Sequence, residues 1–446
     1  MKKTTIALIL SVILTGITKA QVPGEAFPLV NSLSDLWSSG KTEAAIDASI
    51  RLYTIYSPLL IECIHTSLSQ LVKQDSFYYN ANDYLEALIK KNNQGITRIV
   101  KPLYLWSKTI HDSDRVQLNK TFNEMAQVLG DSSDYESKAE SYALLMLNEP
   151  TVQKLIDKDS RDILLHKIVR NLETYPNLDL QVKGRKVQEK RAWNRYLLAY
   201  SYYMRYTFFD RQEEYLIKAS KYSPDEQDVQ VEGYAYFYDA ALLTGNVKRI
   251  GFQKEYLNYL TENHRTREVL AILSEITFNS PSDENLKALK DLYALEPPQV
   301  SFKEYWHQFI NQKGKKVPSL KIEFAEGTLD LTKNRDYWVY IDVWGTWCSP
   351  CVEELPTLQE FFMKNNQRSN PVLKIYTFSF SSPNRVTFMK DKHFTFPVFE
   401  INKKINDDFE VSGYPTKILI SPTGNYVNIP FNVDWRMYIK NYCLLE

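Results

Sequence analysis

The sequence predicts a two-domain protein in which an all-α helical array precedes an α/β domain. Only 14 of the 446 residues are glycine, while 44% are hydrophobic and 13% aromatic, which favours packed helices over disorder. From about residue 31 to residue 296, apolar residues recur at helical spacing. After residue 317 short alternating segments are separated by helical ones, a pattern typical of an α/β domain.

The first twenty residues have the pattern of a cleaved secretory signal. Lys2 and Lys3 precede the apolar residues 6–17, and residues 18–20 fit a cleavage site. A membrane anchor is the alternative, but this apolar stretch is shorter than the roughly 20 residues that a spanning helix needs. We therefore expect a periplasmic or secreted protein that is not stably inserted in a membrane.

Residues 21–300 form the expected helical domain, whose role the sequence does not indicate. Three sets of apolar residues each fall on one helix face: Ile46 with Ile50, Tyr84 and Leu85 with Leu88, and Tyr142 with Leu145 and Met146. Turns are expected at Pro58, Pro102, Pro150, Pro176, Pro224 and Pro281. Residues 193–224, with large aromatic residues facing small ones, resemble a tetratricopeptide helix pair. An irregular helical bundle is the alternative.

A linker at residues 301–316 is expected to join the two domains. It begins with one short helix over residues 302–310, and the lysine-rich residues 311–316 follow. The α/β domain, residues 317–446, is expected to start with a hairpin of residues 320–324 and 328–331. Its other predicted strands cover residues 338–344, 372–378, 416–420 and 426–429, with helices through Phe361, through residues 387–390 and from Asp434.

The chemistry is concentrated where the strand 338–344 gives way to a helix. Residues 347–351 read Trp-Cys-Ser-Pro-Cys. Cys348 stands at the helix N-terminus, where the unpaired N–H groups and the positive dipole end stabilise a thiolate. Cys351 follows one turn later, close enough to resolve a mixed disulfide. A zinc site needs four ligands, and no second Cys/His pair has suitable spacing, so we expect a redox dithiol without metal or cofactor.

The remaining cysteines and the overall charge indicate no further disulfide and no nucleic-acid partner. Cys63 and Cys443 are expected to be unpaired, buried side chains, and a bridge between them is the alternative. Lys plus Arg and Asp plus Glu both count 54, so there is no basic excess for a nucleic-acid partner.

Two motifs carry a family resemblance. Residues 342–356, Asp-Val-Trp-Gly-Thr-Trp-Cys-Ser-Pro-Cys-Val-Glu-Glu-Leu-Pro, resemble the thioredoxin active site, and residues 411–424 resemble the Gly-Tyr-Pro-Thr strand and turn of the same family. More narrowly, residues 317–446 are similar to the extracytoplasmic thiol-disulfide oxidoreductases of the TlpA/ResA type. The resemblance does not cover the helical domain.

The resemblance implies roles for individual residues. Cys348 would be the exposed nucleophile and Cys351 the buried resolving thiol. Trp347, Tyr414 and Pro415 would contact the substrate, with Pro415 as a cis-proline or, alternatively, an ordinary turn proline. Asp342 would be a buried carboxylate that helps Cys351 lose its proton, unless it points outward. Glu354 matches a glutamate common in the TlpA group, although a solvated helix face would also explain it.

The resemblance therefore implies an enzyme, a thioredoxin-like protein-disulfide reductase. Its expected partners are cysteine-containing envelope proteins and a membrane-bound electron donor. A helical envelope interaction or scaffold protein with an accessory redox domain is one alternative. A peroxidase of the peroxiredoxin type is the other, but the residues before Cys348 lack the Pro-x-x-x-Thr-x-x-Cys pattern of that class.

Overall fold

The structure is a computed structural model that describes residues 22–74, 77–224, 228, 231, 235–245, 251–295, 300–324, 327–333, 336–367, 372–431 and 433–445. The expected secretory signal lies outside these residues. The chain divides into two compact units, Met1–Tyr256 and Leu257–Glu446. Among the described residues, no helix combines the length and apolar character that crossing a membrane requires.

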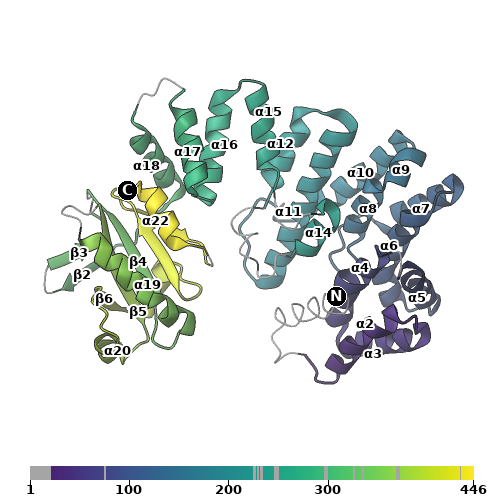
Figure 1. The fold of residues 1–446 in the computed structure, drawn as a ribbon, viewed down its shortest axis with the longest axis horizontal. Coiled ribbons are helices and arrows are strands. Elements are labelled where there is room, and N and C mark those ends of the chain that lie inside the picture. Colours follow the sequence, from purple (N-terminus) through teal and green to yellow (C-terminus); the bar gives the residue numbers. More distant parts are fainter. Residues whose placement is uncertain are drawn as a thin grey trace. The chain divides into compact units, whose positions relative to one another are not determined.

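The first unit is built from helices throughout its described part (Figure 1). They are α2 (Ala26–Ser38), α3 (Thr42–Cys63), the π-helical η2 (Ile64–Leu68), α4 (Ser69–Val72), α5 (Tyr78–Lys90), α6 (Gln94–His111), α7 (Arg115–Val128), α8 (Ala139–Asn148), α9 (Pro150–Leu155), α10 (Lys158–Glu173), α11 (Arg185–Arg205), the π-helical η3 (Tyr206–Asp210), α12 (Glu213–Tyr222) and α14 (Phe237–Thr244). Helix α15 (Gln253–Glu262) runs across the division between the units.

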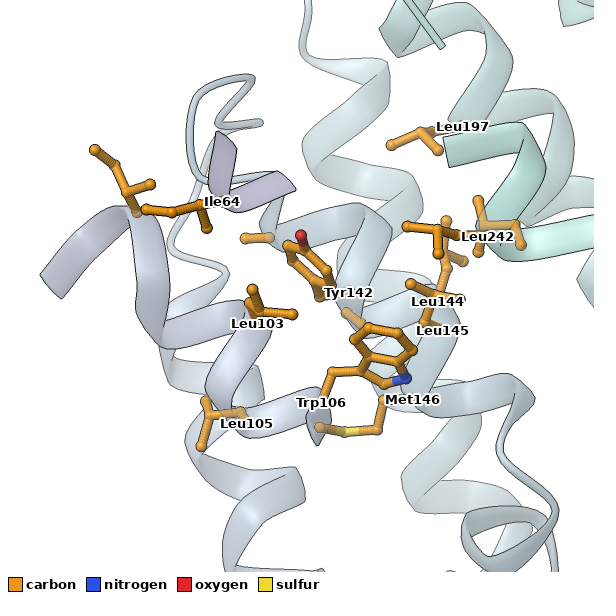
Figure 2. Packing of buried hydrophobic residues seen from close by; sticks show 14 of the residues in the cluster. Ile64, Leu103, Leu105, Trp106, Tyr142, Leu144, Leu145, Met146, Leu197 and Leu242 are labelled. Atoms are coloured by element: carbon orange, nitrogen blue, oxygen red, sulfur yellow. The ribbon is translucent and has the colours of Figure 1, made fainter. Parts of the chain in front are cut away.

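A continuous apolar core holds this array together, because each helix turns an apolar face inward. Figure 2 shows its centre, where Trp106 of α6 lies beside Tyr142 of α8 with their ring centroids 5.6 Å apart. The Tyr142 hydroxyl lies 2.8 Å from Nδ1 of His65, so a buried polar group finds a partner inside the core. The apolar periodicity of the sequence thus identified inward faces correctly at Ile46, Leu88 and Leu145.

The stretch that resembles a tetratricopeptide pair is a pair of helices, α11 and α12. Trp193, Tyr196 and Tyr200 of α11 are buried, as are Leu216 and Ala219 of α12. The predicted helix pair is therefore confirmed, while its tetratricopeptide nature stays a prediction.

Two of the expected proline turns are wrong. Pro58 lies inside α3 and Pro102 inside α6. A proline in a helix removes one hydrogen-bond donor and pushes against the preceding turn, but it can be accommodated by a kink. At Pro58 the helix deviates at Tyr56, whose φ of −160° and ψ of 86° are non-helical. Pro150 behaves as expected and starts α9.

The second unit contains a six-stranded sheet in the order β1-β8-β7-β4-β5-β6 and a separate hairpin. The sheet strands are β1 (Lys315–Lys316), β4 (Trp338–Trp344), β5 (Leu373–Phe380), β6 (Val398–Ile401), β7 (Thr416–Ile420) and β8 (Asn425–Ile429), and the hairpin pairs β2 (Lys321–Phe324) with β3 (Gly327–Asp330). The helices that follow its strands are α19 (Ser349–Asn366), α20 (Arg385–Asp391), α21 (Lys403–Asp408) and α22 (Trp435–Cys443). This confirms the predicted fold class, helical array plus α/β domain.

Strand β4 occupies the middle of the sheet. It runs parallel to β5 and antiparallel to β7, and all seven of its residues are buried. A strand covered on both faces is expected to be continuously hydrophobic, and Asp342 is the single residue of β4 that breaks this pattern. The polar exception therefore stands in the most enclosed part of the sheet.

The expected linker is part of the second unit's folded core. Residues 302–313 form helix α18 (Phe302–Lys313), and β1 follows immediately. Helices α16 (Thr266–Asn279), α17 (Asp283–Tyr293) and α18 share their core cluster with α22 and β4. Trp306 is completely buried, and its indole N–H donates to the carbonyl of Asn441 at 3.0 Å. The array's last helices thus belong with the sheet, because their apolar faces complete its core.

Candidate active site

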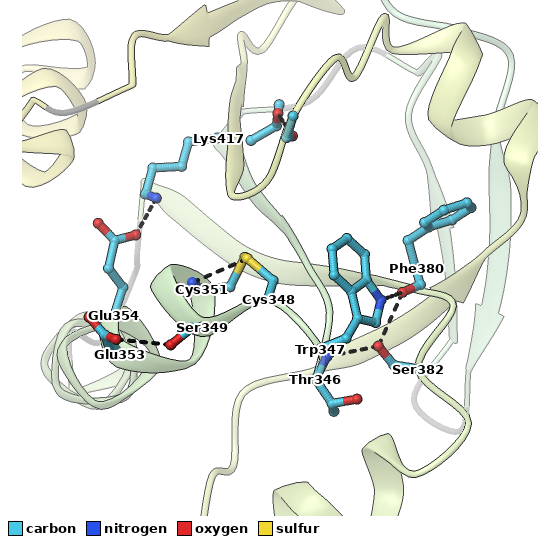
Figure 3. Close-up of a disulfide and its surroundings, with 12 residues drawn as sticks. Thr346, Trp347, Cys348, Ser349, Cys351, Glu353, Glu354, Phe380, Ser382 and Lys417 are labelled. Carbon is cyan, nitrogen blue, oxygen red and sulfur yellow. Dashed lines mark hydrogen bonds and ion pairs between the residues drawn. A yellow bond between two sulfur atoms is a disulfide. The ribbon is translucent and has the colours of Figure 1, made fainter. Parts of the chain in front are cut away.

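The two motif cysteines form a disulfide at the N-terminus of α19 (Figure 3). Cys348 is the N-cap residue, and its sulfur accepts a hydrogen bond from the backbone N–H of Cys351 at 3.3 Å. Pro350 lies in the first turn, where its missing N–H has no helical partner to lose. This is the predicted setting for a reactive sulfur, because the helix terminus favours negative charge there.

Exposure distinguishes the two sulfur-bearing residues less sharply than expected. Cys348 is 6% exposed and Cys351 1% exposed, so both are buried and Cys348 is the more accessible. In the disulfide, the Cys348 sulfur is held against the helix terminus by its bond to Cys351, which reduces its contact with solvent. The expectation that Cys348 is exposed is therefore wrong for this disulfide form, and its role as the nucleophile stays a prediction.

An aromatic wall stands on one side of the disulfide. Trp347 is 54% exposed, and its indole N–H donates to the Phe380 carbonyl at 3.1 Å. The indole folds back over Gly345, where an added Cβ would lie 2.6 Å from Nε1 of Trp347, so only glycine permits this approach. The ring meets Tyr414 edge to face at 5.0 Å, so these two residues lie together beside the motif.

The bond between Tyr414 and Pro415 is cis, as the resemblance implied. The Tyr414 hydroxyl donates to Oδ1 of Asn406 at 2.8 Å, and its ring stacks on Phe380. A cis X–Pro bond turns the preceding backbone outward, where an extended substrate can pair with it. The cis bond at Pro415 is therefore confirmed, while its role toward a substrate stays a prediction.

A cavity of about 260 Å³ lies beside the motif. Its lining residues are Pro350, Glu353, Glu354, Thr357, Pro415, Lys417, Ile429, Pro430, Phe431 and Val433. Pro350 separates the two cysteines in sequence and Pro415 carries the cis bond, so the cavity adjoins both motifs of the site. Phe431 is an exposed aromatic residue at this cavity that the sequence analysis did not single out.

Asp342 points inward, so the alternative of an outward side chain is excluded. It is 2% exposed, its Oδ1 has no hydrogen-bond partner, and the Tyr340 hydroxyl lies 3.5 Å from its Oδ2. Burial raises the pKa of Asp342 to about 6, while the charge of Lys417 lowers it and that of Glu354 raises it. A carboxylate with this pKa can accept a proton near neutral pH.

Replacing Asp342 by asparagine should stabilise the oxidised protein above pH 7. The folded pKa of about 6 lies about two units above the ordinary value of 3.8, so ionising the buried carboxylate costs roughly 1–3 kcal/mol of stability as pH rises from 4 to 7. Because asparagine cannot ionise, its advantage should be complete above pH 7 and vanish below pH 4. Urea unfolding at pH 4 and pH 8 measures this difference.

The exposed variant Asp408→Asn is the control, and its effect should stay within about 0.5 kcal/mol at both pH values. Equal destabilisation by Asp342→Asn at pH 4 and pH 8 would contradict the buried, proton-binding carboxylate.

Sequence reasoning missed the cation of this site. Lys417 lies in β7 and is buried, and its ammonium forms an ion pair with Oε2 of Glu354 at 2.5 Å. Glu354 is therefore more than a solvated helix position. The available signal was a lysine directly before the apolar residues 418–420 of a predicted strand.

The structure also describes the two remaining cysteines and the possible metal ligands. Cys63 and Cys443 are buried and unpaired, which confirms the expectation, and burial raises the pKa of both thiols, to about 12 for Cys63. Within the described ranges, no cluster of three or more His, Cys, Asp or Glu residues could hold a metal ion.

Comparisons with known proteins match the C-terminal part of the chain. Residues 313–428 fit the model of the AhpC/TSA family. The thiol-disulfide oxidoreductase ResA of Bacillus subtilis is 27% identical over 132 residues, which are 29% of this chain and 73% of that protein. The thioredoxin-like protein YneN of the same organism is 27% identical over 115 residues, 25% of this chain and 68% of that protein.

Solved structures match the same part. A thioredoxin-family thiol:disulfide interchange protein of Chlorobium tepidum has 19% identity and a TM-score of 0.25, covering 29% of this chain and 97% of that one. A structure from Bacteroides vulgatus, named as a thiol-disulfide oxidoreductase, has 23% identity and a TM-score of 0.24. The match covers 28% of this chain and 86% of that one. The C-terminal part of this chain is thus similar to the ResA thiol-disulfide oxidoreductases, and these matches lie in that part of the chain.

Proposed function

We propose that the C-terminal domain is an extracytoplasmic thiol-disulfide oxidoreductase that reduces disulfides in substrate proteins. The observation that carries the proposal is the Cys348–Cys351 disulfide at a helix N-terminus, in the same site as the cis bond at Pro415. Similarity to proteins named thiol-disulfide oxidoreductases supports it.

The reaction begins with the reduced dithiol. The Cys348 thiolate attacks one sulfur of the substrate disulfide, a mixed disulfide forms, and the other substrate sulfur leaves as a thiolate that takes a proton from water. Cys351 then gives its proton to Asp342 and attacks the Cys348 sulfur. The Cys348–Cys351 disulfide forms, and the second substrate sulfur leaves and takes up a proton. Two electrons pass from the dithiol to the substrate.

Substrate binding and re-reduction of the dithiol involve other groups. Trp347 and Tyr414 offer an aromatic surface, and the backbone before Pro415 pairs with the extended substrate. Returning the domain to its reduced form requires a dithiol donor, for which we propose a membrane-bound protein. The substrates are cysteine-containing envelope proteins, and the protein is periplasmic or secreted.

The equilibrium redox potential of the dithiol tests the direction of electron flow. Titration of the full chain against dithiothreitol should give a potential near that of thioredoxin, about −270 mV. The variant lacking both motif cysteines is the control, because it removes the titrating pair and leaves Cys63 and Cys443.

A potential near −120 mV would instead indicate an oxidase that donates disulfides. A pair that does not titrate would contradict the redox function altogether. Rapid peroxide turnover without a dithiol substrate would favour a peroxidase.

A further inference from the structure

Lys417 is a buried cation beside the apolar residues of strand β7. Its side chain is 7% exposed, and its neighbours in β7, Ile418, Leu419 and Ile420, are completely buried. Burying an ammonium group is costly unless a negative charge compensates it. The position therefore requires an electrostatic explanation.

Asp342 stands directly opposite Lys417 in the sheet. The two residues are register partners of the antiparallel pair β4–β7. Because side chains alternate along a strand, Asp342 shares a face with Trp344, and Lys417 shares one with Leu419. Trp344 and Leu419 belong to the core cluster that contains Cys348 and Cys351. The aspartate and the lysine thus lie on the sheet face that α19 covers.

Glu354 completes a set of three charges from three elements. It comes from α19, one turn beyond Cys351, and Figure 3 shows its carboxylate and the Lys417 ammonium reaching toward each other. Glu354 and Lys417 also line the cavity beside the motif. The ammonium therefore pairs with a carboxylate that is 42% exposed, while its charge also acts on the enclosed Asp342.

Among the described residues, Lys417, Glu354 and Tyr340 are the ionisable groups that shift the pKa of Asp342. Lys417 faces it from β7 and lowers its pKa, Glu354 faces it from α19 and raises its pKa, and Tyr340 of β4 lowers it through a hydrogen bond. Its register partner on β5, Thr377, carries no charge. Two side chains of opposite charge thus act in opposite directions on one proton acceptor.

We propose that Lys417 is a positioning residue of the redox site, and that its ion pair with Glu354 sets the proton affinity of Asp342 during disulfide exchange. The proposal rests on the proposed function. In the resolving step the Cys351 proton moves to the Asp342 carboxylate, and the Cys351 sulfur bonds to that of Cys348 while the bond from Cys348 to the substrate breaks. Lys417 exchanges no atom or electron. It determines how far the pH must fall before Asp342 is already protonated and can no longer accept that proton.

The two partners of the ion pair should shift the pH profile in opposite directions. Lys417→Met removes the charge that favours ionised Asp342, so the acid limb of the resolving step should move up by about one pH unit. Glu354→Gln removes the charge that disfavours it, so the limb should move down. The double variant should return close to the wild-type midpoint. A pair that only holds the structure together would give the same direction of change in both single variants.

The resolving step can be timed with the reduced full chain and a chromogenic aryl disulfide. One coloured thiolate is released when Cys348 attacks and a second when Cys351 resolves the mixed disulfide. The second phase is measured as a function of pH in each variant. Lys404→Met removes a lysine from the surface ion pair with Asp408 and is the matched control, expected to leave the midpoint unchanged.

The outcomes distinguish a failure of the proposed redox function from a failure of the proposed role of Lys417. If the wild-type protein releases no coloured thiolate, the proposed function fails. If it releases both, and the midpoints of Lys417→Met and Glu354→Gln stay in place or move together, the role of Lys417 is refuted. If Lys417→Met does not fold, Glu354→Gln still tests the proposal. This variant preserves side-chain size, and its acid limb should move to lower pH.

Discussion

Replacing Cys348 by serine should reduce the rate of insulin disulfide reduction by about 10⁴-fold or more, as expected when a nucleophile is removed from residues that act as a unit. A serine hydroxyl does not ionise near neutral pH and does not exchange with disulfides, whereas the Cys348 thiolate is stabilised by the N-terminus of α19. Insulin turbidity measured with the full chain and dithiothreitol as electron source gives the rate.

Cys351→Ser should behave differently from Cys348→Ser. Cys348 still attacks in this variant, but nothing resolves the product, so a mixed disulfide with the substrate should accumulate and be visible by mass spectrometry. Cys443→Ala is the control, because Cys443 is buried in the same unit and unpaired. Trapping through Cys351 in the Cys348→Ser variant would reverse the assignment of nucleophile and resolving thiol.

Replacing Trp306 by alanine should destabilise the redox-active unit by about 3–5 kcal/mol, the usual cost of removing a fully buried tryptophan. The indole packs against Phe309 and Tyr442 and donates its N–H to Asn441. Truncation therefore opens a cavity and leaves a buried carbonyl without its donor. Hydrogen exchange of the β4 amides, measured in the full chain, reports the opening free energy of this unit.

Trp347→Ala is the matched control, since Trp347 is exposed and its removal should cost the sheet little. Unchanged protection of β4 in the Trp306 variant would show that α18 is not part of the folding unit. Unfolding of the oxidised and reduced forms at one pH separates this effect from that of the disulfide.

Much of the second unit could be predicted because its signals are local. The strand 338–344 was recognised from its apolar run, and the dithiol and the cis-proline from short motifs. Strand β6 and helix α21 were missed, because β6 lacks the strict alternation that identified the equally short hairpin strands and α21 has only six residues. Elements this short carry little periodicity of their own and are fixed by their neighbours in space.

The expected linker could not be predicted correctly from local sequence. Residues 311–316 are polar and lysine-rich, as in many linkers, but Gly314 packs closely against the backbone of Tyr426 and β1 pairs with β8. Similarly, the lysine at position 417 has meaning only opposite Asp342, which is 75 positions earlier in the chain. Contacts between distant residues decided both cases, and neither the composition nor the spacing contains them.

The packing of α16–α18 on α22 has a consequence for how partners reach the dithiol. A domain on a flexible tether samples a volume, and its encounter rate with a bound partner depends on the tether's length. Here Asn441 of α22 donates to the carbonyl of Pro281, and Lys440 pairs with Asp283 of α17. The three helices are thus fastened to the redox sheet. A protein held on their outer surface would see Cys348 at one fixed distance and orientation, so geometry would select which of its disulfides can react.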